Sequence, residues 1–168
     1  FKGLSGSGLP DNGFFAANAD HPEVQLSYNN DNNSGNGKII YSSPSTFTVT
    51  PNKYSEIHLF ATSTQGDGSM KVTFNYDDGS SENSTFTVPD WFNRSRTESF
   101  SSYNLIGGLG IFNELRGEAS TSNNAIFGFG FHPNSNKTLQ SFTVTGQSNL
   151  TTQVLFGATG TLADSGKL

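Results

Sequence analysis

Apolar and polar residues alternate with a period of two along much of the chain. Residues 70–76 read MKVTFNY, which places Met, Val, Phe and Tyr on one face of an extended segment and the polar side chains on the other. Half-buried antiparallel strands have this pattern, and no apolar stripe with helical spacing exceeds one turn. The pattern predicts strands at the following segments: 24–28, 47–49, 70–76, 86–88 and 139–144.

Other segments depart from simple alternation in informative ways. Three runs, 38–41, 57–61 and 154–158, are more apolar and are predicted to be central strands. Asp77-Asp78-Gly79 separates segments 70–76 and 84–88, which predicts a hairpin because Asp-Gly favours a short turn with positive φ.

Residues 126–131 read IFGFGF, with aromatic side chains on one parity and two glycines on the other. A strand whose glycine face lies against another element would have this sequence. Residues 93–125 form the longest segment without a clear strand pattern, and we expect a long loop there that is a site candidate by its length. Short helical turns are expected at most near 89–92 or 111–115.

Eight to ten short antiparallel strands predict an all-β sandwich or barrel. The length of 168 residues fits a single module spanning 1–168. Apolar residues make up only 32% of the chain and charged residues 14%, so Ser, Thr, Asn and Gly must form most of the surface. This balance suits a β-rich extracellular domain rather than a helical bundle.

Charge and cysteine content exclude several classes of protein. A net charge of −5 with nine Lys and Arg gives no basic surface for nucleic acid. No apolar run reaches the roughly 18–20 residues of a membrane-spanning helix, so no membrane partner is expected. The chain has no cysteine, which excludes disulfides, thiolate zinc sites and cysteine nucleophiles, and among exported proteins favours a bacterial one.

A series of short motifs follows in a characteristic order. Residues 52–60 read NKYSEIHLF, 66–68 read GDG, 88–92 read VPDWF, 126–144 read IFGFGFHPNSNKTLQSFTV and 153–158 read QVLFGA. Over roughly residues 47–160 this order resembles the galactose-binding-like jelly-roll accessory modules of secreted bacterial enzymes. The resemblance implies a jelly-roll β-sandwich of two antiparallel sheets. It also implies a secreted or cell-surface location and covalent linkage to further domains.

Trp91, the only tryptophan, is the first candidate binding residue. An indole ring can stack on the C–H face of a sugar. The alternative is architectural: Asp90 binds local amides and Trp91 fills the core at a sheet corner. Tyr103, Phe112 and Arg116 lie in the long segment and could form an aromatic platform with a bidentate donor for hydroxyls or a uronate. Otherwise Phe112 packs beneath the loop and Arg116 is solvated.

Metal binding is an open question at this level. His21 with Asp20, Glu23 and Asp31 could assemble a cation or ligand site. Asp67 and the pair Asp77-Asp78 are the nearest candidates for a structural calcium ion, although turn roles explain them fully. No other cofactor is implied.

No catalytic motif is present: the sequence lacks a G-x-S-x-G elbow, H-E-x-x-H, a P-loop and a dinucleotide fingerprint. The sequence therefore predicts a non-catalytic carbohydrate-binding module that targets an attached catalytic domain to a polysaccharide or cell-wall glycan. The alternative is a structural or adhesive domain of a larger surface protein. A small lyase whose paired residues leave no local signature is a third possibility.

Overall fold

The computed structural model describes residues 2–3, 12–17, 23–26, 29–31, 34–36, 38–40, 42–91, 102–113, 118–147 and 150–163. Over these ranges the chain is all-β, with fourteen strands and no helix. The first seven strands are β1 (Lys2–Gly3), β2 (Phe14–Phe15), β3 (Val24–Gln25), β4 (Asn29–Asp31), β5 (Ser34–Asn36), β6 (Lys38–Ile40) and β7 (Ser45–Asn52). The others are β8 (Tyr54–Thr64), β9 (Gly68–Tyr76), β10 (Ser81–Val88), β11 (Ser102–Asn113), β12 (Glu118–Phe131), β13 (Leu139–Gly146) and β14 (Thr152–Leu162).

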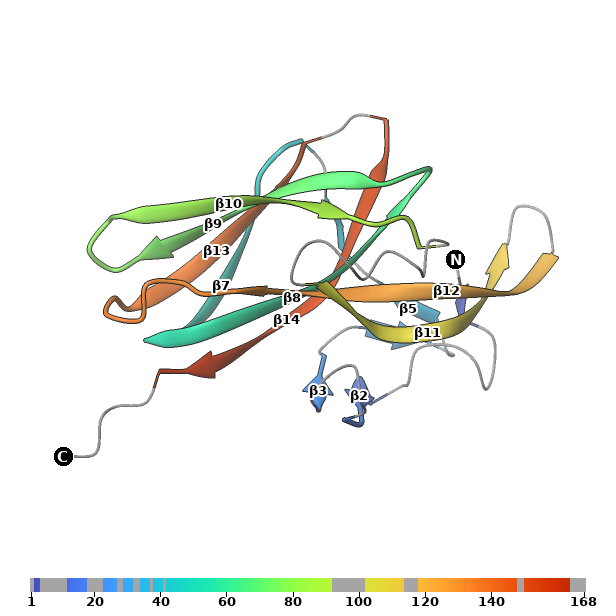
Figure 1. Cartoon of the computed structure of the whole chain (residues 1–168), viewed down its shortest axis with the longest axis horizontal. Coiled ribbons are helices and arrows are strands. Elements are labelled where there is room, and N and C mark those ends of the chain that lie inside the picture. Colours follow the sequence, from blue (N-terminus) through green and yellow to red (C-terminus); the bar gives the residue numbers. More distant parts are fainter. Residues whose placement is uncertain are drawn as a thin grey trace.

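Ten of these strands form two larger antiparallel sheets. The four-stranded sheet has the order β10-β9-β13-β7, and the six-stranded sheet has the order β1-β11-β12-β8-β14-β6. Figure 1 shows β9, β10 and β13 in an upper layer, with β8 and β12 beneath them. The remaining strands pair as β2 with β3 and β4 with β5. The described chain is therefore a sandwich-like all-β structure with small additional sheets.

The main core lies between the two larger sheets, where the apolar parity of each strand points inward. Its members are Ile40 of β6; Tyr54, Ile57, Leu59 and Ala61 of β8; Met70, Val72, Phe74 and Tyr76 of β9; Phe86 and Val88 of β10; Ala125, Phe127 and Phe129 of β12; Leu139, Phe142 and Val144 of β13; and Leu155 of β14. The ring of Phe86 lies 4.9 Å from that of Phe129 and 5.0 Å from that of Phe131. Aromatic contacts between the sheets thus compensate for the low apolar content of the chain.

The opposite face of the four-stranded sheet carries polar side chains, which we call the hydroxyl face. It consists of Thr46, Thr48 and Thr50 of β7; Ser69, Lys71, Thr73 and Asn75 of β9; Ser81, Asn83, Thr85 and Thr87 of β10; and Ser141, Thr143 and Thr145 of β13. All of these residues are exposed or half-buried, whereas the apolar neighbours of opposite parity point toward the core. The alternation predicted from sequence is confirmed in this sheet.

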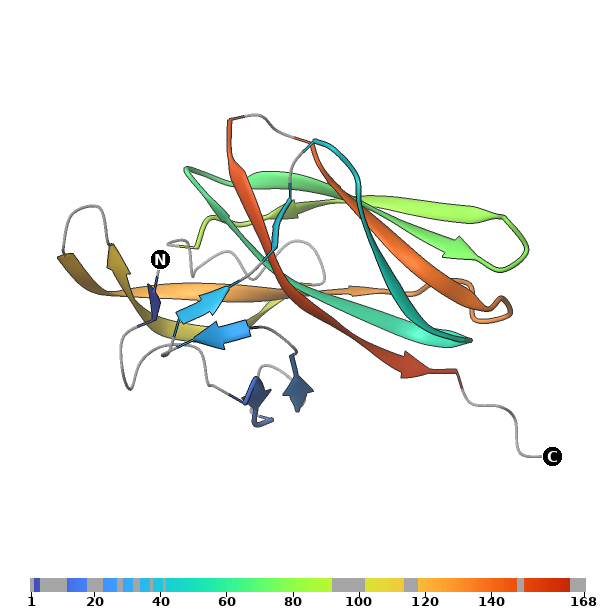
Figure 2. The same ribbon diagram turned by 180° about the vertical axis from the view of Figure 1, so that it is seen from behind.

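A second, smaller core covers the outer face of the six-stranded sheet. Phe60 of β8 and Ile126 of β12 point away from the main core and are buried against Phe15, Val24 and Leu26. Figures 1 and 2 both place β2 and β3 on this side of the sheet. The six-stranded sheet is therefore covered on both faces here, which explains why β8 and β12 carry apolar residues on both parities.

The hairpin and the glycine-containing strand are confirmed. β9 and β10 pair along their length around a turn in which Gly79 has a φ of 78°. In β12, a Cβ at Gly130 would lie 3.3 Å from Glu56 Oε1, which contacts His58 Nε2 at 2.8 Å. Gly130 thus lies beside His58 of the neighbouring strand β8 on one face of the sheet, and His58 is on the opposite face from Ile57 and Leu59, as the alternation requires.

Three expectations are corrected. Much of segment 93–125 is not a loop, since β11 and the first part of β12 form a long antiparallel pair there. Three shifts of register interrupt this pair, and irregular pairing removes the strict alternation that sequence reasoning relies on. The prediction of a central strand at 38–41 is wrong, because β6 lies at the edge of its sheet. No helical turn occurs in the described parts of 89–92 and 111–115: Trp91 is in a turn, and residues 111–113 belong to β11.

Candidate functional site

Polar groups gather at both ends of β9. Gly68 begins this strand beside Ser63, Asp67, Asp90, Trp91 and Gln153, a set that we call the Asp-Trp corner. Tyr76 ends the strand within a second set, which we call the Tyr76 network. It consists of Tyr76, Asp78, Ser80, Glu82, Asn134 and Lys137. The two sets differ in how fully their polar atoms are paired, and this difference decides which of them is the better candidate for binding.

Backbone hydrogen bonds hold the Asp-Trp corner together. The amide of Ser63 donates to the Pro89 carbonyl at 3.0 Å, and the Trp91 amide donates to the Ser63 carbonyl at 2.9 Å. The Trp91 carbonyl in turn accepts from the amide of Ala125 in β12 at 2.9 Å. Trp91 is half-buried, and its backbone is thus anchored on both sides to strands of the six-stranded sheet.

Two carboxylates stabilise the turn between β8 and β9. Asp90 Oδ2 accepts from the Gly66 amide at 2.6 Å, and Asp67 Oδ1 accepts from the Asp90 amide at 2.9 Å. Gln65 and Gly66 have φ angles of 66° and 114°, so this turn uses the left-handed region twice. The role expected for Asp90, binding local amides at a corner, is present in the structure.

Buried polar atoms with unused hydrogen-bonding capacity distinguish this corner. Gln153 and Ser63 are both 0% exposed. The Gln153 Nε2 donates to the Thr151 carbonyl and hydroxyl at 3.0 and 2.6 Å. Among the described residues, Gln153 Oε1, Ser63 Oγ and Thr62 Oγ1 have no hydrogen-bond partner. Unpaired buried polar groups are costly, so the corner keeps a polar interior beside Trp91 at the expense of stability.

The corner does not by itself make a metal site. Calcium takes six to eight oxygen ligands, whereas only Asp67 and Asp90 bring carboxylates here. In the part of the chain that the structure describes, no three His, Asp or Glu side chains gather as metal ligands. Asp20 and His21 lie outside the described residues. A structural calcium ion therefore stays a prediction.

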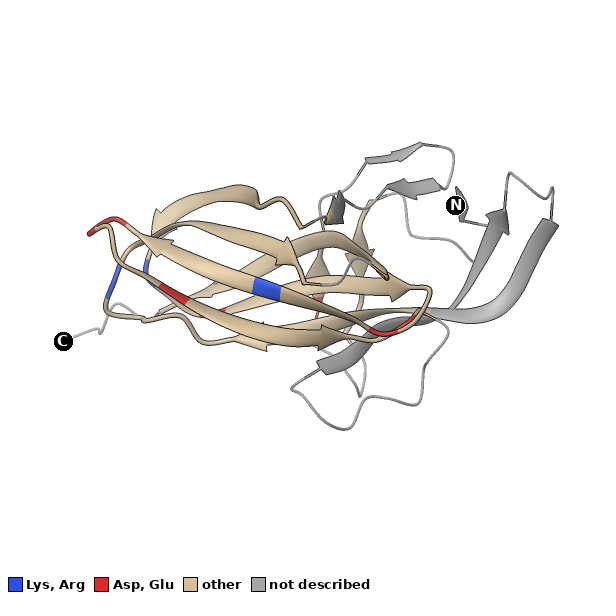
Figure 3. Ribbon diagram, turned by 90° about the horizontal axis from the view of Figure 1, so that it is seen from above, with Lys and Arg blue, Asp and Glu red and all other residues tan. Residues whose placement is uncertain are grey.

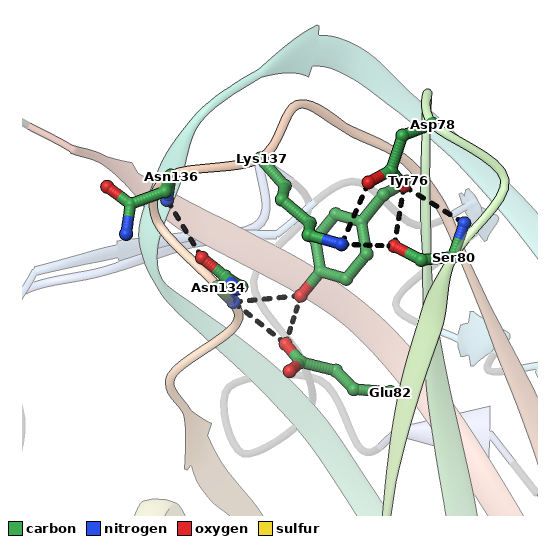
Figure 4. A network of polar contacts seen from close by, with 7 residues as sticks. All are labelled: Tyr76, Asp78, Ser80, Glu82, Asn134, Asn136 and Lys137. Atoms are coloured by element: carbon green, nitrogen blue, oxygen red, sulfur yellow. Dashed lines mark hydrogen bonds and ion pairs between the residues drawn. The ribbon is translucent and has the colours of Figure 1, made fainter.

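The Tyr76 network joins the turn between β9 and β10 to the loop between β12 and β13 (Figure 4). The Tyr76 hydroxyl donates to Glu82 Oε1. The backbone amide of Asn134 donates to the Tyr76 hydroxyl oxygen and to Glu82 Oε1, each at 2.8 Å. Lys137 Nζ lies 2.8 Å from Asp78 Oδ2 and donates to Ser80 Oγ at 2.6 Å. These side chains pair with one another, which is typical of a structural connection between loops.

Two groups in this network have shifted pKa values. Burial raises the pKa of Tyr76 to about 12, and the hydrogen bond to Glu82 adds to the shift. The hydrogen bond from Lys137 holds the pKa of the exposed Asp78 well below its usual range, with a further contribution from Ser80. Both shifts favour the protonation states that hold the network together at neutral pH.

The raised pKa of Tyr76 predicts that the protein loses stability in alkaline solution. Between about pH 10, where an unfolded tyrosine ionises, and about pH 12, the folded state binds the proton more tightly than the unfolded state. The free energy of unfolding therefore falls as the pH rises through this window, by on the order of 1 kcal/mol after allowing for solvent screening.

Chemical denaturation at pH 8 and pH 11 measures this effect, with Tyr76→Phe as the matched variant. The free energy of unfolding should differ less between pH 8 and pH 11 in Tyr76→Phe than in the wild type, because the titrating hydroxyl is absent. An equal difference in both proteins would show that other groups cause the alkaline loss.

The structure separates the residues that were expected to form an aromatic platform. Tyr103 pairs with Gly128 near the start of β11, whereas Phe112 pairs with Ala119 near its end. They stand nine positions apart on the strand, which corresponds to at most about 30 Å. Arg116 lies outside the described residues. Trp91 is the one predicted site residue whose immediate surroundings are described.

Sequence reasoning missed Ser63, Gln153 and the Tyr76 network. Gln153 stands at the start of an apolar run, and a polar residue in such a run is the signal that could have identified it. Comparison with protein-family models and with curated proteins gives no match for this chain. The described residues include no helix with the length and apolar character needed to cross a membrane.

Proposed function

We propose that this chain is a non-catalytic carbohydrate-binding module of a secreted bacterial protein, with a jelly-roll arrangement of its two larger sheets. Successive strands support this arrangement, since the chain passes from β7 to β8 and back to β9, and again from β12 through β13 to β14, changing sheet at each step. The module would hold an attached catalytic domain near a polysaccharide or cell-wall glycan. It requires no catalytic residue and no cofactor.

One observation carries the proposal: Trp91 is half-buried and its backbone is fixed from both sides. A fixed backbone leaves the indole ring fewer orientations, so a sugar that stacks on it loses less entropy than one that must order a mobile segment. The polar, weakly charged surface of the chain suits hydrogen bonding to hydroxyl groups. Tethering raises the local concentration of the attached enzyme, so modest affinity is sufficient.

Trp91→Ala is expected to weaken retention on the preferred glycan at least about fivefold, because the stacking contact of an aromatic ring is worth about 1 kcal/mol or more. Affinity electrophoresis of the 168-residue chain through gels containing soluble polysaccharides measures the retention. Trp91→Phe keeps an aromatic face and should recover part of it.

Phe14→Ala is the matched control, because Phe14 is a 39% exposed aromatic residue of β2, away from the corner. Near-ultraviolet circular dichroism establishes that each variant is folded. Equal retention of the wild type and a folded Trp91→Ala variant would remove Trp91 from the site. A wild type that no glycan retains would contradict carbohydrate binding and favour the structural or adhesive alternative.

A further inference from the structure

The hydroxyl face of the four-stranded sheet is a regular lattice of hydrogen-bonding groups. Its central row crosses all four strands, since Thr143 of β13 pairs with Thr46 of β7 and with Thr73 of β9, and Thr73 pairs with Asn83 of β10. Neighbouring strands lie about 4.8 Å apart, and positions two residues apart along a strand about 6.6 Å. Hydroxyl and amide side chains thus recur at fixed spacings both across the strands and along them.

A second row repeats the arrangement. Ser141 of β13 pairs with Thr48 of β7 and with Asn75 of β9, and Asn75 pairs with Ser81 of β10. Hydrogen bonds connect the two rows, because Asn75 Nδ2 donates to Ser141 Oγ at 3.1 Å and to Thr143 Oγ1 at 3.2 Å. The hydroxyls of Thr143 and Thr46 lie 2.9 Å apart. These contacts orient the side chains before any ligand arrives.

The charge on this face is a single cation. In the row on the other side of the central one, Lys71 of β9 lies between Thr145 of β13 and Thr85 of β10. Lys71 forms no ion pair with any residue that the structure describes. The chain as a whole has a net charge of −5, yet no carboxylate belongs to the face. Figure 3, which looks onto this sheet, shows few charged positions along its ribbons.

We propose that the hydroxyl face binds an acidic polysaccharide, with Lys71 contacting a uronate carboxylate and the surrounding Ser, Thr and Asn side chains binding the sugar hydroxyls. Charge complementarity selects an acidic glycan over a neutral one. A neutral chain laid across this face would desolvate the Lys71 ammonium without supplying a counter-charge, whereas a carboxylate supplies it. A single cation also gives little affinity for the closely spaced phosphates of a nucleic acid.

This inference rests on the proposed function because its ligand is a glycan, but it uses another surface than the Asp-Trp corner. It predicts that Lys71→Gln weakens binding of hyaluronan, in which each uronate alternates with an uncharged sugar, by about tenfold. The same variant should not weaken binding of carboxyl-reduced hyaluronan, because that polymer has no carboxylate to pair with Lys71. Affinity electrophoresis and isothermal titration calorimetry measure both, with polygalacturonate as a second acidic polymer.

A second variant tests the hydroxyl lattice. Thr73→Val combined with Thr143→Val keeps the shape and the strand preference of both residues but removes two central hydroxyls. We expect it to weaken binding of native hyaluronan and of polygalacturonate severalfold. Lys53→Gln, at an exposed position between β7 and β8, and Thr161→Val, exposed on β14 of the other sheet, are the matched controls and should bind like the wild type.

The outcomes separate this inference from the proposed function. Loss of acidic binding in Lys71→Gln, with retention in Lys53→Gln, supports the hydroxyl face, whether or not Trp91→Ala also weakens binding through a second contact at the Asp-Trp corner. Retention of only neutral glycans by the wild type, or loss of binding in Trp91→Ala alone, overturns the inference and leaves the module a carbohydrate binder. Absence of binding to any glycan overturns both.

Discussion

Replacing Phe129 by alanine is expected to lower the free energy of unfolding by about 3–5 kcal/mol, the usual cost of removing a large aromatic side chain from a core. Phe129 is 2% exposed in β12, and its ring lies 4.9 Å from that of Phe86 in the opposite sheet. The substitution would leave a cavity between the two larger sheets, whose strands are held by their hydrogen-bonded neighbours, so the surroundings cannot easily close it.

Urea denaturation followed by tryptophan fluorescence measures the loss. Phe14→Ala removes the same atoms from a residue that is 39% exposed and should cost less than about 1 kcal/mol. Phe129→Leu fills most of the space, so its loss of unfolding free energy should lie between those of Phe129→Ala and Phe14→Ala. Similar losses in Phe129→Ala and Phe14→Ala would contradict the position of Phe129 in the main core.

Gly68→Ala has the second large expected effect, a loss of about 1–3 kcal/mol from overpacking. A Cβ at Gly68 would lie 2.2 Å from Gln153 Nε2 and 2.8 Å from Ser63 Oγ. Both side chains are 0% exposed, so neither can turn into solvent to make room. The change should also alter the fluorescence of Trp91, because the Trp91 amide is bound to the Ser63 carbonyl.

Two comparisons isolate the cause of this loss. Gly79→Ala places a methyl group where nothing lies within 4 Å, so its cost reports only the positive φ of 78°. Combining Gly68→Ala with Gln153→Ala shortens the side chain that the methyl group meets. The double variant should therefore be more stable than the sum of the two single losses predicts. Strict additivity would show that Gln153 is not the obstacle.

The sequence predicted the strands with one buried face and the apolar segments 57–61 and 126–131, which are covered on both faces, but it failed where the pairing is irregular. β9 and β10 were predictable because Asp77-Asp78-Gly79 specifies the turn and alternation specifies the buried face. β11 was not, because its glycines and three register shifts disrupt the period of two. β6 is apolar although it lies at an edge, so apolar content alone did not reveal its position.

The candidate sites depend on contacts that alternation does not encode. Trp91 was identified from residue type, but its anchoring by Ser63 and Ala125 depends on strands far apart in the chain. The Tyr76 network likewise joins Tyr76 to Asn134 across 58 positions. Each Thr of the hydroxyl face looks like an ordinary solvent-facing strand residue, and only the register of four strands assembles them into rows.

The small core beneath β2 and β3 sets a limit on how far this protein can be trimmed. Phe60 and Ile126 are buried against Phe15, Val24 and Leu26, which lie well before β7 in the chain. A fragment that begins at β7 would expose two large apolar side chains in adjacent strands to solvent, a surface that favours aggregation. The smallest autonomous folding unit therefore reaches back at least to Gly13, whose carbonyl accepts a hydrogen bond from the amide of Leu26.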